Sequence, residues 1–262
     1  MDFSTYKTMA FELTGKVLTL TLNRPEKLNP FDAEGEKELT RFLNEAWDDP
    51  SFNVVVITGA GRAFSAGGDF AFMEEVIKDP SLFAVTQAKR TFMAMIEFPK
   101  PIIAKVNGHA IGLGATIALL CDVVFAAEHA KFGDTHVKVG FAAGDGGAIL
   151  WPMLIGFARA KEYLMTGDLI VATEAARIGL INHAVPAEEL DERVMAFAQR
   201  LASGASKSIN YTKQLVNIAL RQAAAGVIDA SVAYEAMTNI TKDHIEGVAA
   251  FKEKRPPQFT GD

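Results

Sequence analysis

The sequence contains very little cysteine and no excess of basic residues. Cys121 is the only cysteine among 262 residues, so the chain cannot form an internal disulfide, and a free thiol is typical of a reducing compartment. It lies in an apolar run, where we expect a small core residue. Lysine and arginine total 26 against 32 acidic residues, which gives a net charge of −6. Nucleic-acid-binding proteins usually carry a basic stripe, so this composition argues against such a partner.

Long hydrophobic runs are also missing from the sequence. No apolar run reaches the roughly 18–20 residues of a membrane span, and the longest candidate, residues 110–127, is interrupted by two glycines and Asp122. Residues 1–4 lack the charged and apolar regions of a signal peptide. We therefore expect a cytoplasmic protein that does not enter a membrane.

The length and the apolar content allow a sizeable core, because 49% of the 262 residues are hydrophobic. Residues 16–22 alternate with a period of two, which predicts a half-buried strand. Residues 54–58 and 102–106 are short, β-branched and bounded by glycine or proline, which is typical of buried strands. Asp32 is a good N-cap for a helix that runs through Leu39, Phe42, Leu43 and Trp47, which recur at helical spacing. Strands and helices alternate as far as residue 127, which predicts an α/β fold with a largely parallel sheet and right-handed crossovers.

The composition changes after Pro186. Residues 187–225 and 227–254 contain few strand signals and are rich in alanine, glutamate, lysine and leucine, so we expect them to be helical. We therefore divide the chain into an α/β core, residues 1–186, and a helical C-terminal region, residues 187–262.

Two glycine-rich turns are the most informative feature of the chain. Each follows an apolar segment and opens a helix: Phe-Ser-Ala-Gly-Gly-Asp at residues 64–69, and Asn-Gly-His-Ala-Ile-Gly-Leu-Gly at residues 107–114. Glycine lets the backbone approach a ligand closely, and the first N–H groups of a helix have no partner within it. If the two turns meet, they place two backbone N–H groups around one developing oxyanion.

These segments resemble the crotonase superfamily, also called the enoyl-CoA hydratase/isomerase family. The resemblance extends from Leu-Asn-Arg-Pro-Glu-Lys-Leu-Asn at residues 22–29 to the block at residues 247–259. It implies a spiral core of ββα turns followed by a C-terminal helical region, with subunits that commonly form homotrimers or dimers of trimers. It also implies an acyl-CoA substrate, in which coenzyme A is part of the substrate and no separate cofactor is needed.

The resemblance assigns the oxyanion hole to the backbone N–H groups of Gly68 and Leu113. Gly68 follows the first glycine of Ala-Gly-Gly-Asp, and Leu113 is the middle residue of Gly-Leu-Gly. Leucine is acceptable there if its φ angle is ordinary, because only the N–H group is used. Enolising an acyl thioester places negative charge on its carbonyl oxygen, and losing one donor typically costs about 3–4 kcal/mol of barrier. Asp69 is expected to cap the following helix.

The same resemblance assigns several residues to substrate binding. Phe64 and Ala66 correspond to positions that contact the adenine and pantetheine portion of CoA. His109 corresponds to a position that lines the pocket in relatives. The remaining histidines outside the motifs are expected at the surface or in packing roles.

Basic residues near the two ends of the matched region are candidates for phosphate contacts. Phe251 and Lys254 lie in a block that resembles the segment closing over the CoA nucleotide, often from a neighbouring subunit. An apolar ring and a cation suit a nucleotide and its phosphates. Arg24 and Lys27 form a second basic cluster, although such clusters are more often solvated faces.

The chain departs from the hydratase pattern at the two glutamates that hold the water and shuttle protons. Thr116 stands where the first is expected, and His136, in Phe-Gly-Asp-Thr-His at residues 132–136, stands where the second is expected. A threonine cannot act as a base near neutral pH, whereas a histidine, with an ordinary pKa near 6.5, can. Thr116 is kept as a substrate-binding candidate, and His136 becomes the candidate acid–base group.

Asp145 follows His136 by nine residues, in a loop rich in glycine. A carboxylate can orient an imidazole and stabilise its cation. The arrangement, followed by Trp151-Pro152, is similar to the β-diketone hydrolases of the superfamily, which cleave a carbon–carbon bond by a retro-Claisen route with a His–Asp dyad. Asp145 also precedes two glycines and an apolar run, which is typical of an ordinary helix N-cap, and His136 is equally suited to a hydrogen-bonded position in the pocket wall. Both interpretations therefore stay open. We find no spacing typical of metal ligands and predict no metal.

Three functions remain to be weighed. The first is hydration of a 2-enoyl-CoA through an oxyanion-stabilised enolate, with His136 as the acid–base group and Asp145 orienting it. The second is hydrolysis of a β-dicarbonyl carbon–carbon bond by the same pair. The third, a non-catalytic or nucleic-acid-binding homologue, is disfavoured by the acidic composition. We expect a lyase of the hydratase type, in fatty acid metabolism, with the hydrolase as the alternative.

Overall fold

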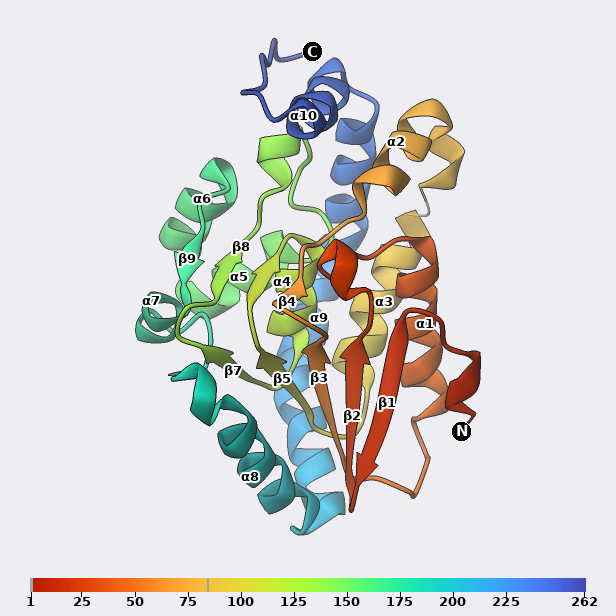
Figure 1. Cartoon of the computed structure of the whole chain (residues 1–262), viewed down its shortest axis with the longest axis vertical. Helices are drawn as coiled ribbons and strands as arrows, with labels where there is room; N and C mark the ends of the chain where they lie inside the picture. Colours follow the sequence, from red (N-terminus) through yellow and green to blue (C-terminus); the bar gives the residue numbers. More distant parts are fainter. Residues whose placement is uncertain (1, 84) are drawn as a thin grey trace.

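The computed structural model describes residues 2–83 and 85–262 and contains two β-sheets surrounded by helices (Figure 1). The larger sheet has the strand order β1-β2-β3-β5-β7-β10, and the smaller one has the order β4-β6-β8-β9. The strands are β1 (Met9–Thr14), β2 (Val17–Leu22), β3 (Val54–Gly59), β4 (Ala63–Ser65), β5 (Ile102–Val106), β6 (His109–Ile111), β7 (Val123–Ala127), β8 (Lys131–Gly133), β9 (Ile170–Val171) and β10 (His183–Val185).

The larger sheet confirms the predicted parallel arrangement. Its strands pair in parallel from β2 through β3, β5 and β7 to β10, and β1 pairs antiparallel with β2 as a hairpin. The three strands predicted from the sequence are β2, β3 and β5, each within one residue of its expected bounds. In β2, Leu18 and Leu20 pack into the main core and Val17 packs into a second cluster, so the period-two pattern separates the two faces of the sheet.

Helices cover both faces of the larger sheet. They are α1 (Ala33–Glu45), α2 (Phe70–Lys78), α3 (Val85–Glu97), α4 (Leu113–Leu120), α5 (Gly147–Ile155), α6 (Phe157–Thr166), α7 (Ala172–Arg177), α8 (Leu190–Ala202), α9 (Ser206–Asn239) and α10 (Lys242–Glu253). α8 buries Leu190, Val194 and Ala198 against one face. α1 and α3 pack on the other face, and α9 packs against α3 along the back of the molecule (Figure 1).

Successive turns of the chain add one strand to each sheet, which is the ββα spiral that the resemblance implied. β3 leads into β4 and then α2, β5 leads into β6 and then α4, and β7 leads into β8. Because β4, β6 and β8 are parallel neighbours, their carboxyl ends lie at one edge of the smaller sheet. The segments that leave these ends therefore converge, which is the usual place for a site in such folds.

Local signals in the sequence correctly predicted the start of α1 and the burial of Cys121. Asp32 caps α1, since its Oδ1 accepts a hydrogen bond from the N–H of Gly35 at 2.9 Å. α1 ends at Glu45, so Trp47, which the helical spacing included, lies beyond it. Cys121 is a buried core residue, as expected, and burial raises the pKa of its thiol.

The C-terminal region is helical, as predicted, but its internal boundary is not where the sequence suggested. α9 runs without interruption through Gly226, whereas the breaks fall at residues 203–205 and 240–241. Ala224 and Ile228 are fully buried on either side of that glycine. Their packing outweighs the roughly 1 kcal/mol that a glycine costs inside a helix.

α9 also has a property that the search for apolar runs missed. It is long and apolar enough to cross a membrane by length and composition, and it is the one such helix among residues 2–83 and 85–262. Only 28% of its most apolar window is buried in this chain. The prediction that the protein stays out of membranes therefore remains a prediction.

α10 folds back over α2 within the same chain, at the top of Figure 1. Phe251 stacks on Phe70 with ring centroids 3.8 Å apart. Lys252 donates a hydrogen bond to Glu74 at 2.6 Å. The closing segment is thus anchored to its own subunit.

Candidate active site

The first glycine-rich turn is hydrogen-bonded to the extended backbone at Phe31. The N–H of Phe31 donates to the carbonyl of Gly67 at 2.7 Å, and the N–H of Asp69 donates to the carbonyl of Phe31 at 2.8 Å. Gly67 has a φ of +91°, which a side chain would rarely allow. Asp69 caps α2 as predicted, by accepting from the N–H of Ala71 at 2.8 Å. None of these hydrogen bonds uses the N–H of Gly68.

The second turn begins α4 in an equivalent way. Gly112 has a φ of 53° and a ψ of −127°, and its N–H donates to the carbonyl of Gly133 at 2.8 Å. α4 starts at the next residue, Leu113, whose φ is not positive. The condition for a leucine at this position is therefore met.

The two turns meet in space. A Cβ atom added to Gly67 would lie 2.6 Å from the carbonyl oxygen of Ile111 and 3.5 Å from the Cα of Gly112. Gly68 and Leu113 line the same cavity of about 120 Å³. Neither of their N–H groups has an acceptor among residues 2–83 and 85–262. Two free backbone donors beside one cavity are what an oxyanion hole requires.

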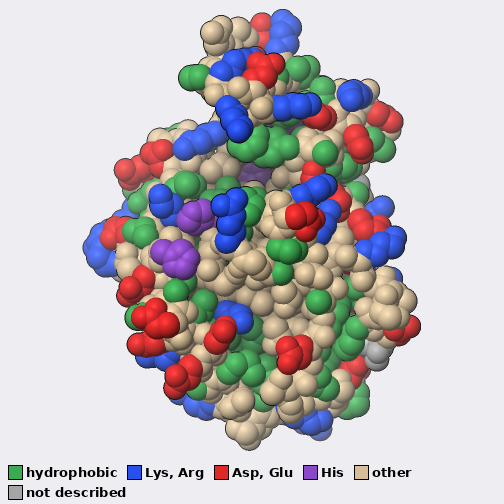
Figure 2. Space-filling view, viewed as in Figure 1, with side chains coloured by type: hydrophobic (Ala, Val, Ile, Leu, Met, Phe, Trp, Pro, Cys, Tyr) green, Lys and Arg blue, Asp and Glu red, His purple; other side chains and the backbone are tan. Residues whose placement is uncertain are grey.

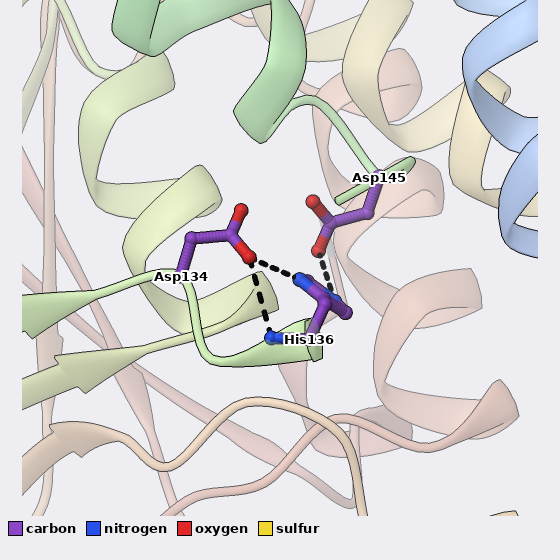
Figure 3. Close-up of side chains that lie close together, drawn as sticks. All are labelled: Asp134, His136 and Asp145. Carbon is purple, nitrogen blue, oxygen red and sulfur yellow. Dashed lines mark hydrogen bonds and ion pairs between the residues drawn. The ribbon is translucent and has the colours of Figure 1, made fainter. Parts of the chain in front are cut away.

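A histidine between two carboxylates lies beside these turns (Figure 3). The Nδ1–H of His136 donates to Asp134 Oδ1 at 2.5 Å. Its Nε2 lies 3.4 Å from Asp145 Oδ2, an ion-pair contact. A Cβ added to Gly112 would lie 3.8 Å from the Cε1 of His136, so the ring borders the second turn. The predicted pair is present, together with a second carboxylate that contacts the ring more closely.

Charge in this group is governed by burial and by the paired carboxylates. Burial opposes a charge on His136, but the carboxylates of Asp134 and Asp145 outweigh it and raise the pKa of His136 well above its usual value. Burial raises the pKa of Asp145, and the imidazole partly offsets this effect. The imidazole is therefore protonated at neutral pH, with a carboxylate facing each ring nitrogen.

Asp145 is positioned by a side chain and by the start of a helix. Thr116 donates its hydroxyl hydrogen to Asp145 Oδ1 at 2.9 Å. The N-cap residue of α5 is Gly146, but the backbone N–H of Gly147, the first residue of α5, also lowers the pKa of the Asp145 carboxyl by hydrogen bonding. The helix-cap interpretation of Asp145 therefore stays open beside the contact with His136. Thr116 is buried beneath Asp145 and is not among the residues that line the cavity, so the structure gives it a positioning role.

The glycines of this loop make room for carboxyl groups from elsewhere in the chain. A Cβ on Gly147 would collide with Asp134 Oδ2, and a Cβ on Gly144 would lie 2.8 Å from Glu235 Oε2. Glu235 comes from α9 and lines the cavity together with Asp145. The density of glycine at residues 144–147 is thus explained by close approach.

Glu235 and Glu36 are two acidic residues that the sequence interpretation missed. Both line the cavity. Burial first, and then neighbouring carboxylates, raises the pKa of Glu36 to about 7. Burial and neighbouring carboxylates likewise raise the pKa of Glu235 to about 8, against an opposing effect of His136. Both groups can hold a proton near neutral pH, which an ordinary glutamate does not.

A larger cavity of about 660 Å³ borders the first glycine-rich turn. Gly68 and Asp69 border both cavities, so the two meet at the first turn. On the face shown in Figure 2, basic side chains surround the hollow beneath the C-terminal lobe and hydrophobic side chains lie inside it. The predicted binding residues that line this larger cavity are Lys27, Ala66, His109 and Phe251.

Three other predicted binding residues lie elsewhere. The side chain of Phe64 is fully buried in the hydrophobic core. Arg24 donates to Asp32 at 2.6 Å and to the carbonyl of Pro30, which ties the loop before α1 together. Lys254 is exposed at the end of α10 and borders neither cavity. For these side chains the structure shows structural or solvent-exposed positions.

The histidine group also has the composition of a possible metal site. Asp134, His136 and Asp145 each offer one ligand atom, and these atoms lie within 4.8 Å of one another. Both ring nitrogens already face carboxylate oxygens, so the protonated imidazole offsets one of the two carboxylate charges. That the protein needs no metal stays a prediction.

Comparison with known proteins matches residues 12–262 to the enoyl-CoA hydratase/isomerase family. The chain belongs to this family. It is 34% identical to the crotonyl-CoA hydratase of Syntrophomonas wolfei, over 97% of this chain and 98% of that protein. It is 35% identical to the 1,2-epoxyphenylacetyl-CoA isomerase of Escherichia coli, over 94% and 95%. Among solved structures, an enoyl-CoA hydratase/isomerase from Mycobacterium paratuberculosis matches with a TM-score of 0.89 at 35% identity, over 92% and 97%.

Membership in the enoyl-CoA hydratase/isomerase family makes the protein an enzyme of the hydratase type with a crotonase fold. The oxyanion turns stand where the sequence motifs placed them. Glutamate is absent from the two positions at which the hydratase pattern expects it. This chain instead places His136, Asp145 and Glu235 along the cavity, and Asp134 hydrogen-bonds to the His136 ring.

Proposed function

We propose that the protein hydrates a short 2-enoyl-CoA. The observation that carries this proposal is the pair of unpartnered N–H groups at Gly68 and Leu113, which border one cavity with His136 and Asp145. In the proposed complex the CoA arm occupies the larger cavity and the acyl group the smaller one. The thioester oxygen accepts both N–H groups, which stabilise the charge that forms as the enolate develops.

The carboxyl groups supply the proton steps of this proposal. Asp145 Oδ2 and Glu235 Oε2 are buried and accept no hydrogen bond from the described residues, so a water between them could donate to both. The water oxygen bonds to C3 while its proton passes to Asp145, whose carboxylate is paired with protonated His136. The enolate then takes a proton at C2 from the neutral carboxyl of Glu235, and Asp145 returns its proton to Glu235.

This assignment modifies the roles expected from the sequence. Asp134 is the residue that fixes the imidazole, through the 2.5 Å hydrogen bond to Nδ1. His136 stabilises the carboxylate of Asp145 as its ion-pair partner. Asp145 provides the oxygen that accepts the proton of the water. A second candidate function, retro-Claisen hydrolysis of a β-dicarbonyl substrate, is favoured by the same His136–Asp145 contact of 3.4 Å.

The proposal extends to assembly and location. The outer surface of α9 exposes large apolar side chains, which suits a homotrimer or a dimer of trimers in which partner subunits cover them. These exposed side chains include Tyr211, Leu215, Val216, Tyr234, Met237 and Ile240. We further propose a cytoplasmic enzyme that uses no cofactor beyond the CoA of its substrate, does not bind nucleic acid and acts on fatty acyl groups.

The test is the rate at which crotonyl-CoA loses its conjugated double bond. We expect His136→Ala to lower kcat by at least about a hundredfold, the scale of general acid–base catalysis, because Asp145 loses the cation that pairs with its carboxylate and no longer accepts the water proton in the right form. The matched control is His129→Ala, because His129 is an exposed histidine outside both cavities. A His136→Ala enzyme that retains the full rate would contradict the assignment.

A further inference from the structure

The smaller cavity contains polar oxygens that the proposed hydration does not use. Glu36 lies one turn into α1, and its carboxyl group has no hydrogen-bond or ion-pair partner in the part of the chain that the structure describes. Its neighbour Glu38 shows what a structural glutamate looks like here. Glu38 accepts hydrogen bonds from the N–H groups of Lys7 and Thr8 and from the Thr8 hydroxyl, at 2.6–2.9 Å. The carboxyl group of Glu36 accepts no comparable hydrogen bonds from the described residues. A structural role in the fold therefore does not explain why a glutamate stands there.

Two amide side chains that line the same cavity also have oxygens without a partner among the described residues. Asn239 is 3% exposed, lines the cavity, and its Oδ1 has no partner among the described residues. Gln87 also lines the cavity, and its Nε2 is held by the Thr40 hydroxyl at 3.0 Å and the backbone carbonyl of Glu36 at 3.4 Å. That carbonyl can only accept, which identifies the nitrogen end of the amide and leaves the Gln87 oxygen available.

The unused groups are therefore oxygens from three different helices: α1, α3 and α9. Asn239 Oδ1 is fully buried, which costs free energy unless a ligand pairs with it, and Glu36 and Gln87 place their oxygens along the same cavity. Apart from the His136 group, Glu235, Lys37 and Asp69, the rest of the wall is apolar and aromatic, including Phe31, Phe72 and Phe83. A pure hydrocarbon chain would leave the oxygens unpaired, and a carboxylate would face further carboxyl groups.

We propose that the acyl group bound in this cavity carries a hydroxyl group, which is recognised by Glu36 together with the amide oxygens of Gln87 and Asn239. A hydroxyl fits because it both donates and accepts. It can donate to an amide oxygen or to ionised Glu36, and it can accept from protonated Glu36. The substrate class is thus a short hydroxylated enoyl-CoA, a specification that rests on the proposed acyl-CoA function.

The experiment measures binding, so that it does not depend on turnover. Wild-type protein is titrated calorimetrically with four saturated thioesters that cannot be hydrated: butyryl-CoA, 4-hydroxybutyryl-CoA, succinyl-CoA and 4-(trimethylammonio)butyryl-CoA. We expect 4-hydroxybutyryl-CoA to bind about tenfold more tightly than butyryl-CoA, the scale of one hydrogen bond to an otherwise unpaired group. Succinyl-CoA should bind more weakly than butyryl-CoA.

Variants of two residues on α1 test whether Glu36 causes the preference for 4-hydroxybutyryl-CoA over butyryl-CoA. Glu36→Leu should bring the hydroxybutyryl-to-butyryl ratio close to one, and Glu36→Gln should retain part of the preference because its amide can still hydrogen-bond. Glu34→Gln is the matched control, since Glu34 is exposed on the same helix and pairs with Lys7. It should leave the ratio unchanged.

Several results would overturn the proposal. Equal binding of the butyryl and hydroxybutyryl thioesters by wild type would do so, as would a preference that survives Glu36→Leu. Tightest binding of the trimethylammonio compound would make the cavity a cation site instead. Failure of hydration alone would leave a measured binding preference intact, so the two proposals fail separately.

Discussion

Glu235→Gln tests whether the cavity acids are held protonated by the fold. The pKa of Glu235 is raised from 4.5 to about 8, so the folded protein keeps a proton that the unfolded chain releases. The group therefore lowers stability as pH rises through 4.5, where the unfolded group ionises, until the folded group ionises near pH 8. Between pH 4.5 and pH 7 the loss amounts to about 3 kcal/mol.

Glutamine has nearly the shape of the protonated glutamate but cannot ionise. The variant should therefore match wild type in stability near pH 4.5 and exceed it by up to about 3 kcal/mol at pH 7. For a chain of this size that difference corresponds to a rise in Tm of about 6–12 °C. The same variant should lose about a hundredfold in kcat, because an amide cannot protonate carbon.

The assay is thermal unfolding of both proteins across pH 5 to 8, with the exposed-site variant Glu34→Gln measured alongside. The control should follow wild type at every pH. If Glu235→Gln showed no pH-dependent gain, or were less stable than wild type at pH 8, the account of a buried and protonated Glu235 would be refuted.

Three further predictions concern the parts of the site. Asp145→Asn should lower kcat much more than CoA affinity; a variant that only melts at a lower temperature would indicate a structural role. Asp134→Asn should lower the pKa of His136, because the nearer carboxylate is removed, and a pH–rate profile identical to wild type would contradict this. Gly112→Ala should reduce kcat by about a hundredfold and stability by about 1–3 kcal/mol, because alanine is strained at its positive φ; kinetics and unfolding of one preparation measure both.

The meeting of the two glycine-rich turns was predictable from the sequence, for a physical reason. The predicted oxyanion donors belong to turns whose glycines are required by close approach, and such glycines are visible in a sequence. Gly67 and Gly112 show this directly, since each has a positive φ and the two lie in contact. The strands and the cap at Asp32 were predictable because their signals are local.

The carboxyl groups around His136 were harder to predict because tertiary packing assembles them. Asp134 lies only two residues from His136, so its signal was available in the motif and was overlooked. Glu36 and Glu235 come from α1 and α9, far apart in the sequence, and share the cavity only after folding. Helical periodicity does not identify which acidic residue on a helix faces a cavity. The uninterrupted course of α9 through Gly226 was missed for the same reason, because packing overrides a local penalty.

Product analysis tests the central claim most directly. Purified protein is incubated separately with crotonyl-CoA and with a short β-ketoacyl-CoA, and both reactions are followed by mass spectrometry. The account predicts that crotonyl-CoA gains one water with no break in its carbon chain, and that the β-ketoacyl thioester is unchanged. Cleavage of the β-ketoacyl substrate between its carbonyl carbons, with crotonyl-CoA left intact, would contradict hydration and make the protein a carbon–carbon bond hydrolase.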